Sequence, residues 1–170
     1  SLPDYMARIV NNGIQQGGVE SVVPQAIRKS QLDKVSLFLS ADDQAAVLAQ
    51  YTLVTADSPD YAQYIQTYPA LADEPVYVLT ATDAAALDAI KLPLSKALLA
   101  VSGIEQALAD PEKAAALGQT GGFNLAALPA GADVFALLGL LPANTRTQMM
   151  DAMNQRFDAL GESMIAQSAV

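Results

Sequence analysis

The sequence predicts a mainly α (α+β) fold, an irregular helical domain with a small two-stranded β-element, on two observations. Apolar residues recur at helical spacing in most segments, and the second half of the chain is rich in Ala and Leu. Only two runs, 51–55 and 75–80, are β-branched and aromatic and are bounded by Asp, Ser or Pro. Because the 170 residues are 52% hydrophobic and 16% charged, they suffice for one core, and we expect a single domain over residues 1–170.

The first predicted element is a helix over residues 1–18, which has apolar residues at helical spacing but little start signal. Two short helices are predicted after Ser30 and Ser40, because each serine precedes an Asp by three residues and so approximates a capping box. Residues 36–39 also suit a strand. The next helix begins at residues 58–59, since serine favours the cap and proline the first helical position.

The remainder of the chain is predicted to be rich in helices. The expected order is a helix to Ile90, a break near Pro93, a helix over 94–108, a short helix from Asp110, a loop over 118–124 and a turn at 128–131. An apolar run over 134–141 then ends at Pro142 and falls short of the ~20 apolar residues that span a bilayer. We interpret this run as a buried core helix, with a membrane-dipping segment as the alternative.

The final helix is predicted to run from near Asn144. Its apolar residues are spaced by 4, 4, 3 and 4 positions, at Met149, Met153, Phe157, Leu160 and Met164. Such a stripe is typical of a helix face that packs on a core. The alternative is an adaptable contact surface for a partner or an apolar ligand, formed by Met149, Met153, Phe157 and Met164, because methionine side chains are flexible.

Tyrosines are concentrated in the predicted helix after residue 58. Tyr61, Tyr64 and Tyr68 share one face of this helix, and with Tyr51 and Tyr77 they are a second candidate contact surface. The alternative is a set that straddles core and solvent, in which each hydroxyl finds a nearby hydrogen-bond partner.

The residue types argue against catalysis. The chain has neither His nor Cys, which removes Cys-His and Ser-His nucleophiles and most zinc sites. No Ser precedes a Lys by three residues, and the glycines at 118–122 lack the Lys-Ser/Thr ending of a phosphate loop. The acidic pairs lack calcium-loop spacing and suit helix N-termini. We therefore expect no catalytic, cofactor-binding or metal-binding residues.

The charge balance excludes one class of partner. Nine basic and eighteen acidic residues give a net charge of −9, which repels phosphate backbones, and the cations are scattered. We therefore expect no nucleic acid partner.

The opening stretch resembles a known family. Its order of residues is Leu2-Pro3, Met6, Ile9-Val10-Asn11 and Gly13-Ile14. This order is similar to the outer end of the first membrane helix in ABC exporters of the multidrug and lipid type. The resemblance implies that 1–18 is the outer extension of that helix. It also implies that Leu2, Pro3, Met6, Ile9 and Val10 are membrane-proximal.

Later segments resemble a large insert between the first and second transmembrane helices of some Gram-positive permease and ATPase polypeptides. These segments are Val23–Ser30, Tyr51–Val54, Tyr68–Leu71, Glu74–Leu79 and Lys96–Glu105. The resemblance implies a non-catalytic domain on the extracellular face of the cell membrane, with 144–170 leading toward the second membrane helix and the N- and C-terminal helices on the same side.

The same resemblance implies partners and cofactors outside this domain. The partners would be the membrane and nucleotide-binding domains of the exporter and a second half-transporter. ATP and Mg would bind in the full-length protein and serve ATP-driven transport, with no cofactor in this domain.

Two other functions stay open on the sequence. One is a free-standing secreted or surface-attached helical protein that binds an apolar ligand or a protein partner through a groove near Met149 to Met164. The other is an enzyme that uses carboxylates, since the separation of two carboxylates is set by the fold.

Overall fold

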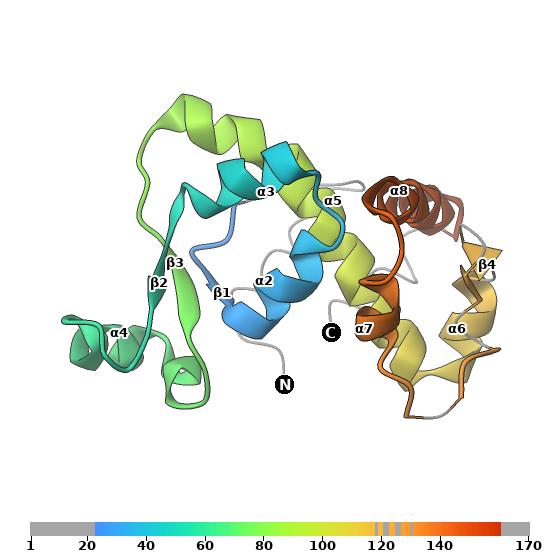
Figure 1. Cartoon of the computed structure of the whole chain (residues 1–170), viewed down its shortest axis with the longest axis horizontal. Helices are drawn as coiled ribbons and strands as arrows, with labels where there is room; N and C mark the ends of the chain where they lie inside the picture. Colours follow the sequence, from blue (N-terminus) through green and yellow to red (C-terminus); the bar gives the residue numbers. More distant parts are fainter. Residues whose placement is uncertain (1–22, 118, 121–122, 125–126, 130, 161–170) are drawn as a thin grey trace.

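The fold is mainly helical with a small antiparallel sheet, which confirms the predicted class (Figure 1). The computed structural model describes residues 23–117, 119–120, 123–124, 127–129 and 131–160. The predicted helix over 1–18 and the segment 161–170 lie outside these described residues, as does the predicted placement of the two terminal helices on one side.

The sheet has three strands in the order β1-β3-β2, where β1 is Ala26–Arg28, β2 is Tyr51–Val54 and β3 is Val76–Leu79. Val76 of the central strand pairs with Arg28 on one side and Val54 on the other. The sequence predicted β2 and β3 but missed β1, so the predicted two-stranded element is incomplete. A strand of three residues is too short to show the alternation that identifies strands.

Two short helices follow β1, namely α2 (Lys29–Ser36) and α3 (Ala41–Leu48). The predicted cap of α3 is confirmed, because the Ser40 hydroxyl accepts a hydrogen bond of 3.1 Å from the Asp43 amide. The predicted cap of α2 is wrong: the helix begins at Lys29, and the Ser30 hydroxyl donates to Glu74 instead.

The tyrosine helix α4 (Tyr61–Thr67) begins two residues later than Pro59, the predicted first position, and leads to the short 3₁₀ helix η1 (Pro69–Ala72). Ser58 does not cap α4, because its hydroxyl accepts a hydrogen bond of 2.8 Å from the Thr55 amide and closes a turn.

The helix α5 (Ala84–Ala109) has 26 residues and is the longest helix described. It contacts α2 and α3 on the side of the sheet and α6 and α8 at the other end of the molecule (Figure 1). The predicted break near Pro93 is wrong, since the helix continues through it. Proline removes one backbone hydrogen bond, at a cost of about 3 kcal/mol. Burial of Ile90, Leu94 and Leu98 on either side of Pro93 offsets that cost.

After α5 come α6 (Pro111–Leu117), the strands β4 (Gln119–Thr120) and β5 (Phe123–Asn124), α7 (Val134–Leu138) and α8 (Ala143–Leu160). The start of α6 is as predicted, because Asp110 accepts a hydrogen bond from the Glu112 amide. The predicted loop over 118–124 contains a paired antiparallel β4 and β5. The predicted final helix is confirmed as α8 over its described length.

The core is continuous along α5. It collects side chains from the sheet, α2, α3, α7 and α8, which lie on different sides of α5. The largest fully buried side chains are Phe38, Ile27, Leu32, Ile90, Leu94, Leu98, Ile104, Leu138, Met153, Gln31 and Val35.

Candidate functional site

The methionine stripe of α8 belongs to the core where it is described. Met149 is 2% exposed and Met153 is 1% exposed, and both pack in the main cluster of apolar side chains. These two residues therefore belong to the core, as the core interpretation predicts, and they do not form an exposed surface in this structure. The Phe157 side chain and all of Met164 lie outside the described part of the chain.

The tyrosines of α4 are half-buried and pack against the edge of the core. The Tyr61 hydroxyl donates a hydrogen bond of 3.3 Å to the Leu71 carbonyl, as expected for residues that straddle core and solvent. Tyr51 is buried and donates to the Pro24 carbonyl at 2.7 Å, so it is a core residue. A contact surface at Tyr61, Tyr64 and Tyr68 stays a prediction.

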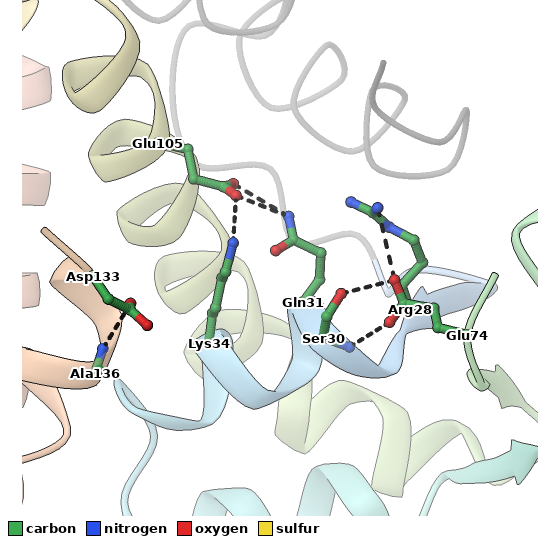
Figure 2. A network of polar contacts seen from close by, with 8 residues as sticks. All are labelled: Arg28, Ser30, Gln31, Lys34, Glu74, Glu105, Asp133 and Ala136. Atoms are coloured by element: carbon green, nitrogen blue, oxygen red, sulfur yellow. Dashed lines mark hydrogen bonds and ion pairs between the residues drawn. The ribbon is translucent and has the colours of Figure 1, made fainter. Parts of the chain in front are cut away.

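A polar network that the sequence did not predict joins α2 to α5 (Figure 2). The Glu105 carboxylate accepts hydrogen bonds from Lys34 Nζ at 3.0 Å and from Gln31 Nε2 at 3.2 Å. Gln31 is 1% exposed, so its amide depends on Glu105 in place of water. Lys34 Nζ also lies 4.7 Å from the centre of the Phe135 ring, which brings α7 into the network.

A second carboxylate, Glu74, ties the loop before β3 to the start of α2 (Figure 2). It accepts hydrogen bonds from the Ser30 amide at 2.8 Å and the Ser30 hydroxyl at 2.9 Å, and Arg28 lies 3.9 Å away. Because both oxygens have protein partners, this carboxylate orders the chain and satisfies one of the free amides at the helix start.

Arg146 of α8 is a third polar link. Its guanidinium donates to the carbonyls of Leu37, Leu138 and Leu141, which lie at the ends of α2 and α7. Helix ends leave carbonyls without helical partners, and one cation here satisfies carbonyls from two helices. Sequence reasoning had no signal for this role, because Arg146 and Leu37 are 109 residues apart.

The polar side chains described above link elements of the fold to one another. Glu105 and Glu74 already accept hydrogen bonds from Gln31, Lys34 and Ser30. Among the described residues, no three His, Cys, Asp or Glu side chains cluster in a way that could hold a metal ion. A hydrogen bond to Asp33 raises the pKa of the Lys29 amine above its usual value, but this pair lies on the surface.

Apolar side chains are exposed at α7. The predicted core helix over 134–141 is half right, because Val134 and Leu138 are buried, whereas Leu137 is 39% exposed and Leu140 is 81% exposed. Within the described residues, no helix is both long enough and apolar enough to cross a membrane.

The residues predicted to be membrane-proximal, Leu2, Pro3, Met6, Ile9 and Val10, lie outside the described part of the chain. Comparisons with protein families, curated proteins and solved structures found no match to this chain.

Proposed function

We propose that this chain is a non-catalytic extracellular domain of an ABC exporter of the multidrug or lipid type. It would stand between the first and second transmembrane helices and serve ATP-driven transport as an accessory module. ATP and Mg would bind to the nucleotide-binding domains elsewhere in the polypeptide. The partners would be those domains, the membrane domain and a second half-transporter.

The observation that carries the proposal is the opening motif, in which Leu2-Pro3, Met6, Ile9-Val10-Asn11 and Gly13-Ile14 stand in the order found at the outer end of the first exporter helix. The scarcity of Lys and Arg, nine in 170 residues, is in keeping with the outer face of a membrane protein.

The packing of the described residues suits a mechanical role. Glu105 of the long helix α5 is hydrogen-bonded to α2. Arg146 of α8 is hydrogen-bonded to the ends of α2 and α7. We expect these hydrogen bonds to oppose relative movement of α2, α5, α7 and α8. Between two membrane helices, the domain would shape the outer exit or limit how far the outer helix ends separate during alternating access.

The alternative is a free-standing secreted or surface-attached helical binding protein, and it gains no support from the described part of its proposed groove. That alternative placed an apolar groove near Met149 to Met164, of which Met149 and Met153 are buried in the core, whereas the Phe157 side chain and Met164 lie outside the described part of the chain. A carboxylate enzyme gains no support from Glu74 or Glu105, because each already binds protein donors.

Cysteine labelling of the native polypeptide tests the proposal. The chain described here contains no Cys, so Leu92→Cys, at a side chain that is 48% exposed, introduces one thiol into it. In a background cleared of other cysteines, we expect a membrane-impermeant maleimide to label intact cells. Labelling that appears only after lysis would place the domain inside the cell and refute the proposal. The sequence around the domain is a second test, since about 20 apolar residues should stand on each side of it.

A further inference from the structure

The helix α5 divides at Pro93 into two segments. Proline has no amide hydrogen, so the carbonyl of Ala89 lacks its usual donor four residues later, and the proline ring also crowds that carbonyl. Figure 1 shows the first turns of α5 running at an angle to the rest of the helix, which is the bend that an internal proline produces. We call residues 84–92 the arm and residues 94–109 the trunk.

Burial differs between the two segments. Ile90 is the one buried residue of the arm, whereas ten residues of the trunk are buried. Five of the nine arm residues are exposed, and Leu92 at the end of the arm is 48% exposed. Because most of the stability of a helix in a protein comes from its buried apolar face, the trunk is held more strongly than the arm.

The polar links of α5 to other elements also lie on the trunk. Glu105 accepts hydrogen bonds from two side chains of α2, and Gln106 accepts one of 2.9 Å from a lysine of α6. Among the described residues, no side-chain hydrogen bond or ion pair joins the arm to another element. The arm has an ion pair of its own, Lys91 with Asp88, which is exposed and lies within the arm.

The sequence of the arm supports a helix only in part. Four of its nine residues are alanines, which favour a helix, and the Asp83 carboxylate caps its start by accepting a hydrogen bond of 3.2 Å from the Ala85 amide. A helix shorter than about 12 residues is nevertheless marginal in water on its own. The arm therefore depends on its continuity with the trunk, and Pro93 interrupts the hydrogen bonds that provide it.

We propose that the arm is a conformational device that unwinds as one unit up to Pro93, while the trunk stays helical and packed. Proteins open locally in cooperative units, and units with few buried contacts open most readily. Opening exposes Ile90 and lets the connection between β3 and the trunk lengthen by up to about 16 Å, because an extended residue spans about 3.3 Å and a helical residue about 1.5 Å. The arm is thus the part of α5 that yields when the sheet and the trunk are drawn apart.

Hydrogen–deuterium exchange of the unchanged chain tests the opening. After correction for intrinsic rates, we expect the amides of residues 88–92 to exchange about 100-fold faster than those of residues 98–104. Urea below the unfolding transition should accelerate the trunk amides more than the arm amides. The reason is that an opening of nine residues exposes little surface, whereas the trunk opens only with the whole fold.

Pro93→Ala is the variant that restores the missing amide. It should slow the exchange of amides 88–92 about tenfold, because alanine donates to the carbonyl of Ala89 and favours a helix interior. The matched control is Pro59→Ala, at an exposed proline in the turn before α4, which should change the same rates by less than about threefold. Circular dichroism of each variant verifies the fold.

Two outcomes overturn the inference. The first is equal protection and equal urea dependence of amides 88–92 and 98–104, which would show that α5 opens as one helix. The second is a Pro93→Ala variant whose arm exchanges as fast as that of the unchanged chain, which would show that the proline does not set the boundary. Neither outcome affects the exporter proposal, which the labelling of intact cells tests separately.

Discussion

The Nε atom of Arg146 donates a hydrogen bond of 2.6 Å to the main-chain oxygen of Leu37, across 109 residues of sequence. This bond connects the first turn of α8 to the C-terminal end of α2. The same guanidinium also binds the carbonyls of Leu138 and Leu141. Arg146 thus supplies hydrogen bonds to the ends of both α2 and α7, so its substitution should destabilise both helix ends.

Arg146→Met should lower the free energy of unfolding by about 2 kcal/mol, because methionine keeps much of the packing but leaves carbonyl groups without a charged donor. The stability of Arg146→Lys should lie between that of the unchanged chain and that of Arg146→Met, because a lysine ammonium cannot reproduce the planar fork of donors. Urea denaturation measures both. Lys91→Met is the control, and its exposed pair with Asp88 predicts a change below about 0.5 kcal/mol. An Arg146→Met variant as stable as this control would show that the bonds add nothing.

Glu105→Leu should lower the free energy of unfolding by about 2 kcal/mol. The substitution leaves the buried Gln31 amide without its acceptor and Lys34 without its counter-charge. Glu105→Gln keeps an oxygen for Gln31 and should lose about 1 kcal/mol or less. The two variants compared by urea denaturation separate the hydrogen bond from the charge. Equal losses would contradict the dependence of Gln31 on this oxygen.

The features that the sequence predicted correctly are those with a local cause. The cap at Ser40 and the start of α6 at Asp110 depend on residues within three positions, and the structure has both. The strands β2 and β3 have enough β-branched and aromatic residues to be recognised. The helical class follows from apolar spacing along whole segments.

The features that the sequence missed depend on distant contacts. The helix α5 passes through Pro93 because the residues around it are buried by other elements, which no local rule includes. The same holds for the candidate site: Lys34 meets Glu105 across 71 residues. Composition could not show that Leu138 would be buried while Leu140 would be exposed.

Met153→Ala should lower the free energy of unfolding by about 2 to 4 kcal/mol, since Met153 is 1% exposed and the substitution leaves a cavity beside α5. Gln155→Ala, at an exposed position of the same helix, is the control and should change stability by less than about 0.5 kcal/mol. Thermal and urea unfolding both measure the difference. A Met153→Ala variant with unchanged stability would return this residue to the surface interpretation.

Gly131→Ala should lower the free energy of unfolding by about 1 kcal/mol through the backbone alone. Gly131 has a φ of +83°, and a Cβ placed on it would meet no atom within 4 Å, so no collision contributes. Gly131→Asn should lose less, because asparagine tolerates positive φ better than alanine. The order of stability Gly, Asn, Ala in urea denaturation supports this assignment, and equal stability of all three would reject it.

The distance between Leu2 and Val170 should be short if the domain stands between two adjacent membrane helices. Packed helices lie about 8 to 10 Å apart, and spin labels at the two positions add their own reach to that separation. Cysteines at both positions are specific labelling sites, because the chain has no other. Electron spin distance measurements on the isolated domain should give a single short distribution. Ends on opposite faces would refute the insert and favour the free-standing binder.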